Sequence, residues 1–341
     1  MPRIDSDAHV HETERTWEFM EGSDVEYKPF TVVAEDGSRP GSRYWVVDGR
    51  LIPRGGNVAA TISAELREGA DIKARLQHMD ELEVDVQVIF PSLFLRPLTR
   101  RPEVEVALCR SYNRWLADIW RQGGDRLRWA AVLPLMDIDA SLGEARFARD
   151  NGGCALFTRG VYENRVLTDS YFDPLYETAS DLNMPVCIHA ATPSFEWQQT
   201  FEREIGFAKF KLPAVSTFHT IIADGLPSRF PRLRFGFIEV SSQWVPYALH
   251  DLAKRFQRRG QQLSKDVMRE SRIYVACQVD DDIPYVLQYA GEDNIVIGSD
   301  YGHADTATEL EALSKLQLTG ELSATAINKI LDDNARALYG L

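Results

Sequence analysis

Two histidines and two aspartates stand at the ends of short apolar segments, and their spacing suggests a metal centre. Asp7 and His9 are two residues apart, so in an extended chain both side chains leave the same face. His189 ends the segment Val-Cys-Ile-His, and Asp300 ends Ile-Val-Ile-Gly-Ser-Asp. Two imidazoles and two carboxylates suit Zn²⁺, Mn²⁺ or Fe²⁺ better than Ca²⁺ or Mg²⁺.

Each of these residues also has a purely structural explanation. A single histidine at a strand end is usually a hydrogen-bonded structural residue, and an aspartate there often caps the following helix. Asp300 precedes Tyr-Gly-His and could be a turn residue. The metal interpretation therefore depends on the combination, because four such residues at strand ends of one fold can converge.

The elements that would position these residues alternate along the chain. Apolar, β-branched segments predict eight strands, at Arg3–His9, Val84–Pro91, Arg128–Leu135, Cys154–Thr158, Pro185–His189, Leu233–Val240, Ile273–Cys277 and Asn294–Ser299. Helical periodicity predicts eight helices, at Ile72–Leu82, Pro102–Gln122, Ala140–Asn151, Pro174–Leu182, Phe207–Gly225, Trp244–Arg258, Ile283–Ala290 and Thr308–Leu316. Strict alternation predicts an α/β fold, a (β/α)₈ TIM barrel, in which strands one, five and eight end at one mouth. An open doubly wound sheet usually has a Gly-rich loop after its first strand, and none is present.

We expect residues 1–341 to form one domain, with residues 12–70 as a lid-like insertion after the first strand. The segment contains a probable-turn dipeptide, Asp48-Gly49, between apolar residues, which predicts a hairpin. An insertion at this point reaches the face where barrel enzymes carry their active sites. It is either a surface loop of variable sequence or the wall of a substrate pocket, formed by Trp17, Phe19, Tyr44 and Trp45.

Composition narrows the class of protein. The 341 residues are 44% hydrophobic, enough for a packed core, and 38 basic against 51 acidic residues give a net charge of −13. Such a surface repels nucleic acid and anionic lipid, so we expect neither as a partner. The four cysteines are far apart in apolar surroundings and indicate reduced core thiols. With no apolar run long enough for a membrane helix and no signal-peptide pattern, we expect a cytoplasmic protein.

Five motifs together resemble the amidohydrolase superfamily, in the branch that includes aminocarboxymuconate-semialdehyde decarboxylase and γ-resorcylate decarboxylase. The resemblance spans nearly the whole chain. The motifs are Ile4-Asp-Ser-Asp-Ala-His9, Pro185-Val-Cys-Ile-His189, Phe230-Pro-Arg-Leu-Arg-Phe-Gly-Phe-Ile-Glu239, Gly298-Ser-Asp-Tyr-Gly-His303 and Asn334-Ala-Arg-Ala-Leu-Tyr-Gly-Leu341.

The resemblance implies metal ligands in the first, fifth and eighth strands. Asp7 and His9 occupy the positions of the family's His-x-His pair, and Glu12 completes an Asp-x-His-x-x-Glu pattern found in relatives. A competing register would use His9 and His11. His189 is then the third ligand, and Asp300 is the acidic residue that touches both the metal and its bound water.

One departure from the family pattern bears on the reaction. Where the decarboxylases tend to end the sixth strand with a catalytic histidine, this chain has Glu239. His219, in the preceding helix, is either an ordinary helix residue or, with Glu12 and Glu239, part of a second metal position. A branch with the Asp-x-His-x-x-Glu signature holds two metals and performs oxygenation with iron.

Two further residues complete the candidate site, and two histidines are set aside from it. His303 is expected at the mouth, where it could bind substrate or orient Asp300. Arg159 follows the fourth strand and is either a carboxylate clamp or a solvated loop residue. His78 and His250 fall on predicted outer helices, and we interpret both as structural.

The expected activity is metal-dependent hydrolysis of a small carbonyl- or carboxylate-bearing substrate by a metal-activated water. The metal is zinc by preference, with manganese or iron as alternatives and possibly two ions. Asp300 would be the general acid–base, with Glu239 and His303 as the next candidates. Alternatives are non-oxidative decarboxylation at the same site, a dinuclear iron oxygenase, or a non-catalytic subunit. We expect a homodimer or pairing with a homologous subunit.

Overall fold

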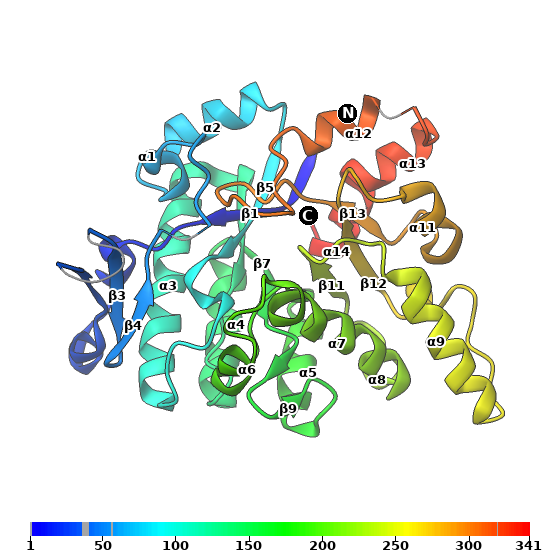
Figure 1. Ribbon diagram of the computed structural model, residues 1–341, viewed down its shortest axis with the longest axis horizontal. Coiled ribbons are helices and arrows are strands. Elements are labelled where there is room, and N and C mark those ends of the chain that lie inside the picture. The colour runs from blue at the N-terminus through cyan, green and yellow to red at the C-terminus, as the bar shows by residue number, and fades with distance from the viewer. Residues whose placement is uncertain (1, 36–40, 56, 319) are drawn as a thin grey trace.

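The computed structural model describes residues 2–35, 41–55, 57–318 and 320–341. Eight parallel strands form one sheet, and neighbouring strands in the sheet follow their order in the chain (Figure 1). The strands are β1 (Ile4–Val10), β5 (Val86–Pro91), β6 (Leu127–Ala131), β7 (Gly153–Thr158), β10 (Val186–His189), β11 (Phe235–Ile238), β12 (Ile273–Cys277) and β13 (Ile295–Ile297). A bridge between Ala8 and Tyr301, just beyond β13, brings the last strand against the first. The predicted TIM barrel is confirmed as a nearly closed barrel.

Helices follow the strands and surround the barrel. The longer ones are α2 (Ile72–Glu81), α3 (Pro102–Gly123), α4 (Ile138–Asp150), α5 (Asp173–Asp181), α7 (Leu212–Ala223), α9 (Val245–Arg258), α11 (Ile283–Ala290) and α12 (Ala312–Leu318). The short ones are α1 (Ala64–Arg67), α6 (Phe195–Thr200), α8 (Leu226–Arg229), α10 (Val267–Glu270), α13 (Ala324–Asn328) and α14 (Asn334–Tyr339). Aspartates start three of them, because the carboxylates of Asp71, Asp137 and Asp282 accept backbone N–H groups of the first turn.

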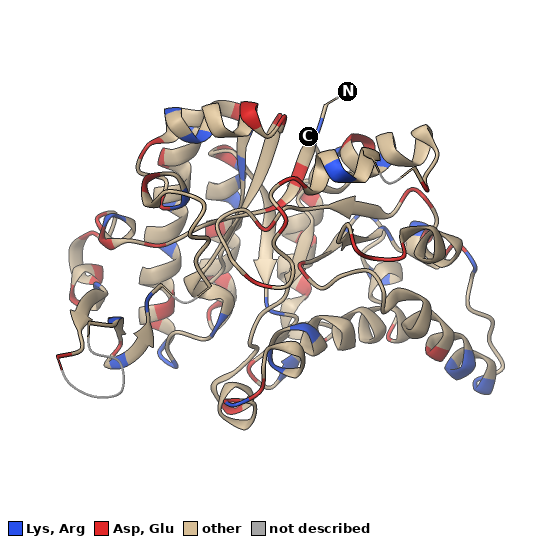
Figure 2. Ribbon diagram, turned by 45° about the horizontal axis from the view of Figure 1, so that its top comes forward, with Lys and Arg blue, Asp and Glu red and all other residues tan. Residues whose placement is uncertain are grey.

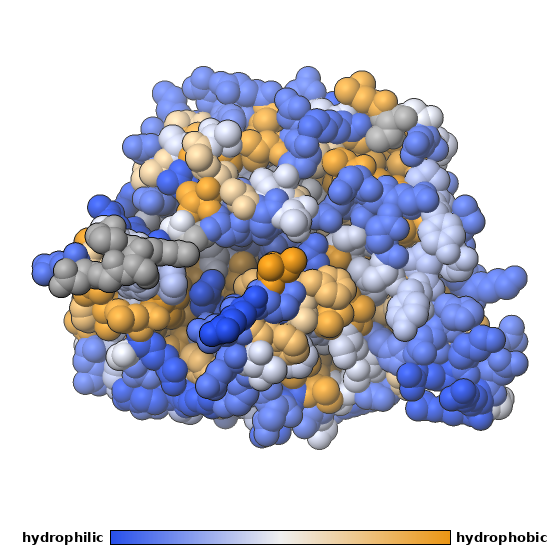
Figure 3. Space-filling view, viewed as in Figure 1, coloured by the Kyte–Doolittle hydropathy of each residue, from blue (hydrophilic) through white to orange (hydrophobic). Residues whose placement is uncertain are grey.

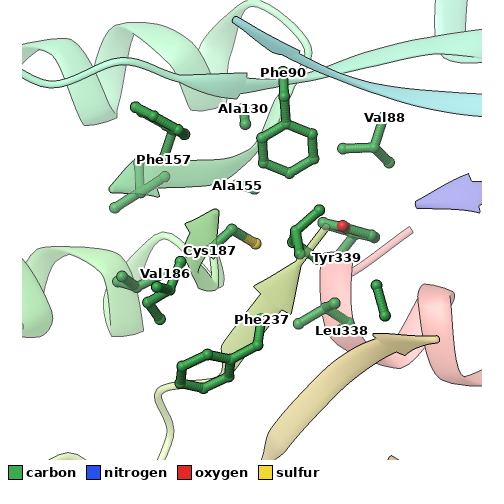
Figure 4. Close-up of a cluster of buried hydrophobic side chains, with 14 of the residues drawn as sticks. Val88, Phe90, Ala130, Ala155, Phe157, Val186, Cys187, Phe237, Leu338 and Tyr339 are labelled. Carbon is green, nitrogen blue, oxygen red and sulfur yellow. The ribbon is translucent and has the colours of Figure 1, made fainter. Parts of the chain in front are cut away.

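Apolar side chains of the strands and of α14 fill the barrel interior. Figure 4 shows Phe90 of β5, Cys187 of β10 and Tyr339 of α14 grouped together, whereas the Phe237 ring of β11 points away from Tyr339 and packs against Phe218 of α7. The Tyr339 hydroxyl donates to the Ser6 carbonyl at 2.8 Å, which ties the C-terminal helix to the first strand. Lysines, arginines and carboxylates are spread mainly over the outer helices (Figure 2), and the face seen in Figure 3 mixes hydrophilic and apolar residues. Across the described ranges, no helix is long and apolar enough to cross a membrane.

The segment between β1 and α2 forms a separate small sheet. Its strands are β2 (Phe30–Val33), β3 (Arg43–Val47) and β4 (Arg50–Pro53), which lie beside α3 (Figure 1). The predicted hairpin is present, with Asp48 and Gly49 both at positive φ (45° and 73°), as a two-residue turn requires. Two 3₁₀ turns, η1 (Glu14–Trp17) and η2 (Gly22–Tyr27), precede the sheet, and the Ser111 hydroxyl of α3 donates to the Thr16 carbonyl.

Three predicted strands are too long: Leu233–Val240 is Phe235–Ile238, Asn294–Ser299 is Ile295–Ile297, and Arg128–Leu135 ends early. The segment Arg128–Leu135 leaves the sheet after Ala131. The amide side chain of Asn113 on α3 accepts from the Val132 N–H and donates to the Val132 carbonyl, so a side chain replaces the neighbouring strand as hydrogen-bond partner. Pro134, which has no N–H to donate, follows two residues later. This contact between Asn113 and Val132 cannot be predicted from the local hydrophobic pattern of the strand.

Candidate metal centre

Four side chains meet where the strands end. Asp7 and His9 lie on β1, His189 ends β10, and Glu239 directly follows β11; each offers one ligand atom, and these atoms all lie within 4.8 Å of one another. The Asp7 Oδ1 atom is 3.3 Å from His9 Nε2 and 3.2 Å from His189 Nε2. Glu239 Oε2 is 3.3 Å from His189 Nδ1. We call these four residues the central cluster.

A second group overlaps the first. It combines His9 and Glu239 with Asp300 and His303, again with ligand atoms within 4.8 Å of one another. His9 Nε2 is 3.5 Å from Asp300 Oδ1 and 3.7 Å from Glu239 Oε2. Because the two groups share two residues, one ion could use either, or two ions could lie side by side.

The contacts of His9 leave the lone pair of its Nε2 atom available to a cation. Nδ1 lies 3.0 Å from the Pro91 carbonyl, which can only accept, so Nδ1 carries the proton. Burial lowers the pKa of His9 well below its usual value, so Nε2 presents a lone pair to the carboxylates. Among the residues that the structure describes, neither His9 Nε2 nor Glu239 Oε2, both buried atoms, has a hydrogen-bond partner. Lone pairs that face carboxylates without a donor fit a divalent metal ion.

Asp300 and His303 hold a proton beside this cluster. The Ser92 hydroxyl uses its one hydrogen on the Val10 carbonyl at 2.8 Å, so at the 2.9 Å contact His303 Nε2 must be the donor. His303 Nδ1 is 2.8 Å from Asp300 Oδ1, and a bond of this length also needs a hydrogen. The proton therefore resides either on the second ring nitrogen or on the carboxyl. Thr308 donates to the other oxygen of Asp300 at 2.6 Å.

Burial raises the pKa of Asp300 and of Glu239, the two site carboxyls that follow strands. It raises the pKa of Asp300 to about 6, although His303 opposes this by attraction and hydrogen bonding. Burial, and then repulsion by Asp300, raise the pKa of Glu239 well above its usual value. A carboxyl with a pKa of about 6, such as Asp300, is suited to exchange protons near neutral pH unless a cation binds it.

The backbone is unusual at the same two positions. Glu239 and Asp300 have φ values of 61° and 53°, a left-handed conformation that is uncommon outside glycine. Gly298 lets the eighth strand approach the first, because a Cβ there would lie 2.2 Å from Asp7 Cβ. Strained residues often concentrate at functional sites, and here the strain turns two carboxylates toward one point.

A buried polar network supports the two ligands of β1. The Asp5 carboxylate accepts from the Asp7 N–H at 3.2 Å and from Gln87 at 3.3 Å. The fully buried Arg75 donates to the Gln87 side chain at 3.0 Å and to the His9 carbonyl at 3.1 Å. Hydrogen bonds of this kind orient ligands from the second layer of a metal site. Arg75 carries no local sequence signal of this role, since it belongs to a helix.

The structure brings together the residues expected from the first, fifth and eighth strands, and it places the candidates Glu239 and His303 beside them. Glu12 lies beside the centre but outside both ligand groups, because its oxygens accept the Ser92 and Leu93 N–H groups at 3.2 and 2.8 Å. His11, the competing ligand in the first strand, lies outside them as well and contacts the Gly302 carbonyl.

His219 is placed elsewhere, which corrects its expected role in a second metal position. Its Nε2 lies 2.9 Å from Asp251 Oδ2 on α9, and its side chain is 26% exposed. The residue therefore joins two outer helices. Helical periodicity alone could not tell which side of α7 carries it.

The predicted substrate residues lie near the mouth with different degrees of access. Arg159 is 7% exposed, with its guanidinium 5.0 Å from the Tyr162 ring centre, so it is not a solvated loop residue. Trp45 lines a cleft beside the centre and lies under the guanidinium of Arg54. Trp17 is fully buried against Trp45, so it supports the cleft wall from behind.

Ser92 is a site residue that the sequence analysis missed. It directly follows β5, the neighbour of β1 in the barrel, and fixes the His303 ring. Its position at a strand end was the available signal, but serine is common in turns and has no distinctive spacing.

Solved structures of known proteins share the fold of this chain. An amidohydrolase from Mycobacterium avium subsp. paratuberculosis K-10 superposes with a TM-score of 0.79 at 21% identity, covering 99% of both chains. The manganese-bound 5-carboxyvanillate decarboxylase from Novosphingobium aromaticivorans DSM 12444 gives 0.71 at 20% identity, covering 100% of this chain and 96% of that one. The 4-oxalomesaconate hydratase from Rhodopseudomonas palustris gives 0.67 at 18% identity, covering 99% and 95%.

These structural likenesses establish the fold, and their different activities leave the reaction open. We found no match among curated proteins. The family model described as amidohydrolase matches residues 4–341, nearly the entire chain. With the nearly closed barrel and a His/Asp/Glu cluster that can hold a divalent metal at its mouth, this match shows that the chain belongs to the amidohydrolase family, whose members in this fold are enzymes.

Proposed function

We propose that this enzyme is a metal-dependent hydrolase that uses water to attack a small carbonyl- or carboxylate-bearing substrate. The observation that carries the proposal is the pair of buried, unpartnered atoms, His9 Nε2 and Glu239 Oε2, within the central cluster. A divalent metal bound there would polarise the electrophile and lower the pKa of water from about 15.7 to about 7. Two imidazoles with two or three carboxylates fit Zn²⁺, with Mn²⁺ or Fe²⁺ as alternatives.

Asp300 supplies the proton transfer in this proposal. Its Oδ1 lies 3.5 Å from His9 Nε2, so it faces the position that a ligand of the cluster would occupy. It takes a proton from the attacking water and returns it to the leaving group. His303, held by Ser92, steadies the Asp300 carboxylate, and Arg159 offers a guanidinium for a substrate carboxylate.

Non-oxidative decarboxylation is the second candidate. The observation that favours it is the proton shared by Asp300 and His303, because this reaction requires an acid that protonates the carbon losing CO₂. Glu239 at the end of the sixth strand, where decarboxylases of the family tend to carry a catalytic histidine, argues for hydrolysis instead.

Two measurements test the proposal. An anomalous-difference map of crystals grown from protein purified without chelator should show a peak among Asp7, His9, His189 and Glu239, and its absence would refute the metal site. Two peaks roughly 3.5–4 Å apart would favour a dinuclear centre. With a substrate found by screening esters, lactones, amides and aromatic carboxylates, ¹⁸O transfer from labelled water indicates hydrolysis, whereas CO₂ release without ¹⁸O in the organic product indicates decarboxylation.

A further inference from the structure

A cleft of about 280 Å³ opens beside the metal centre, between the insertion and the loop that follows β5. Its lining residues include Glu12, Trp45, Arg54, Arg67, Ser92 and Arg96. Ser92 links the cleft to the centre, because its hydroxyl accepts from His303, the partner of Asp300. A molecule in this cleft is therefore next to the reacting groups without occupying the ligand positions themselves.

The cleft is rich in arginine although the chain as a whole carries a net charge of −13. Arg54 is paired with Glu14 at 2.7 Å, and the Arg67 guanidinium donates to the Ile62 carbonyl. Arg96 differs from both. Its buried Nε has no hydrogen-bond partner, and within the described ranges no carboxylate lies within 4 Å of its guanidinium.

Arg96 also occupies a shared position. It lines a second cleft, with Arg50, Arg100 and the Phe195 ring, so one guanidinium borders both cavities. Its carbonyl lies 3.4 Å from Nη1 of Arg159, whose own Nε is likewise buried and unpartnered. Two arginines without an acidic partner among the described residues therefore occur on adjacent parts of the mouth.

Arg96 is partly buried, and its buried Nε–H lacks an acceptor, which is costly. A planar carboxylate can satisfy this N–H and a second N–H of the guanidinium at once. Glu12 attracts the charge of Arg96, but it does not supply the missing hydrogen-bond acceptor. Its oxygens already accept the Ser92 and Leu93 N–H groups. Trp45 and Leu93 add apolar walls to the cleft. The arrangement matches a small organic anion with an apolar body.

We propose that Arg96 binds a second carboxylate of the substrate, distant from the group that reacts at the metal centre, so that the enzyme acts on dicarboxylates. This rests on the proposed function, because the first carboxylate or carbonyl is assigned to the central cluster. Arg96 is then a residue that determines specificity, and the apolar part of the substrate spans the distance along Trp45.

The test compares probes of matched shape. Binding of isophthalate and glutarate, and of their monocarboxylate counterparts benzoate and butyrate, is measured by calorimetry on the Mn²⁺-loaded and the chelator-treated protein. The variants are Arg96→Gln, which removes the charge, and Arg96→Lys, which keeps the charge but not the planar fork. Arg269→Gln, at an exposed ion pair on α10, is the control.

At least one dicarboxylate should bind the loaded wild type about tenfold more tightly than its monocarboxylate counterpart, as expected for a charge-assisted hydrogen bond. Arg96→Gln should remove this preference, Arg96→Lys should retain part of it, and the control should not change it. If no dicarboxylate is preferred, or if the preference survives Arg96→Gln, the inference is wrong. If instead the preference depends on Arg96 but Mn²⁺ has no effect on affinity, the carboxylate subsite stands and the metal function fails.

Discussion

Two histidine–aspartate contacts of similar length occur in this molecule, at the barrel mouth and in the outer helix layer. His189 Nε2 lies 3.2 Å from Asp7, and His219 Nε2 lies 2.9 Å from Asp251. The first pair is almost fully buried, whereas the second pair has side chains that are 26% and 35% exposed. Contact distance by itself therefore does not distinguish a metal centre from a surface pair.

The two regions differ in how many ligand atoms meet at one point and in whether solvent reaches them. At the mouth, His9 and Glu239 face the same point, and within the described residues neither His9 Nε2 nor Glu239 Oε2 has a hydrogen-bond partner. In the outer layer, Asp251 is satisfied by His219 and by Arg255 at 2.5 Å, and water reaches the pair. Buried polar atoms that lack partners require a ligand, and exposed paired ones do not.

The largest expected difference between the regions is in metal binding. His189→Ala should weaken binding of a divalent ion by roughly 10³-fold, because the ~10–16 kcal/mol of a structural zinc site is shared among about four ligands. Metal content by mass spectrometry and a competition titration would measure it. His219→Ala is the matched control and should bind as the wild type does; equal loss in both variants would remove the distinction.

The next difference is in the pH dependence of stability. Burial raises the pKa of Glu12 from 4.5 to about 7, so the folded state favours the protonated form. Stability from this group is present below pH 4.5 and is lost as the pH rises to about 7. At 1.36 kcal/mol per unit over 2.5 units, the loss is about 3 kcal/mol.

Glu12→Gln should abolish this loss in urea denaturation of the chelator-treated protein between pH 4 and 8. In the outer layer, the pKa of Asp251 is shifted in the opposite direction, downward. Arg255 first, and also His219, lower the pKa of Asp251, so its contribution is present above its ordinary pKa of 3.8 and is lost only at lower pH. An Asp251→Asn variant should therefore follow the wild type from pH 5 to 8. Parallel curves for Glu12→Gln and the wild type would show that Glu12 does not titrate as its burial implies.

A third substitution separates ligation from proton transfer at the mouth. Asn at position 300 keeps the shape and one oxygen, but it cannot act as a base. Asp300→Asn should fold normally, retain much of the metal, and lose about 10²-fold in turnover of a substrate identified by screening. Near-normal turnover with normal melting temperature would move the proton-transfer role to Glu239 or His303.

The smallest effect is expected in the outer layer. His219→Ala removes one exposed contact to Asp251, which keeps Arg255 as a partner. The melting temperature should change by at most roughly 2 °C, as is usual for surface substitutions. Differential scanning calorimetry would check this, and a large destabilisation would mean that the pair is an important link between α7 and α9.

Much of the fold could be predicted because its signals are local. Alternation of β-branched segments with helical periodicity identified the eight barrel strands, and Asp48-Gly49 identified a hairpin. The ligands of the first strand followed from the period of two, which places Asp7 and His9 on one face. His189 and Asp300 followed from parallel strands, whose ends must meet at one side of a barrel.

Tertiary structure decided the rest, because the deciding quantities are not local. The rotation of α7 about its axis sends His219 outward to Asp251, and the left-handed backbone at Glu239 directs its carboxylate to the cluster. The isolation of the Arg96 guanidinium depends on which carboxylates other segments bring near it. Sequence thus determined which residues could meet at the strand ends, whereas burial and the partners supplied from elsewhere in the chain determined which of them are left needing a ligand.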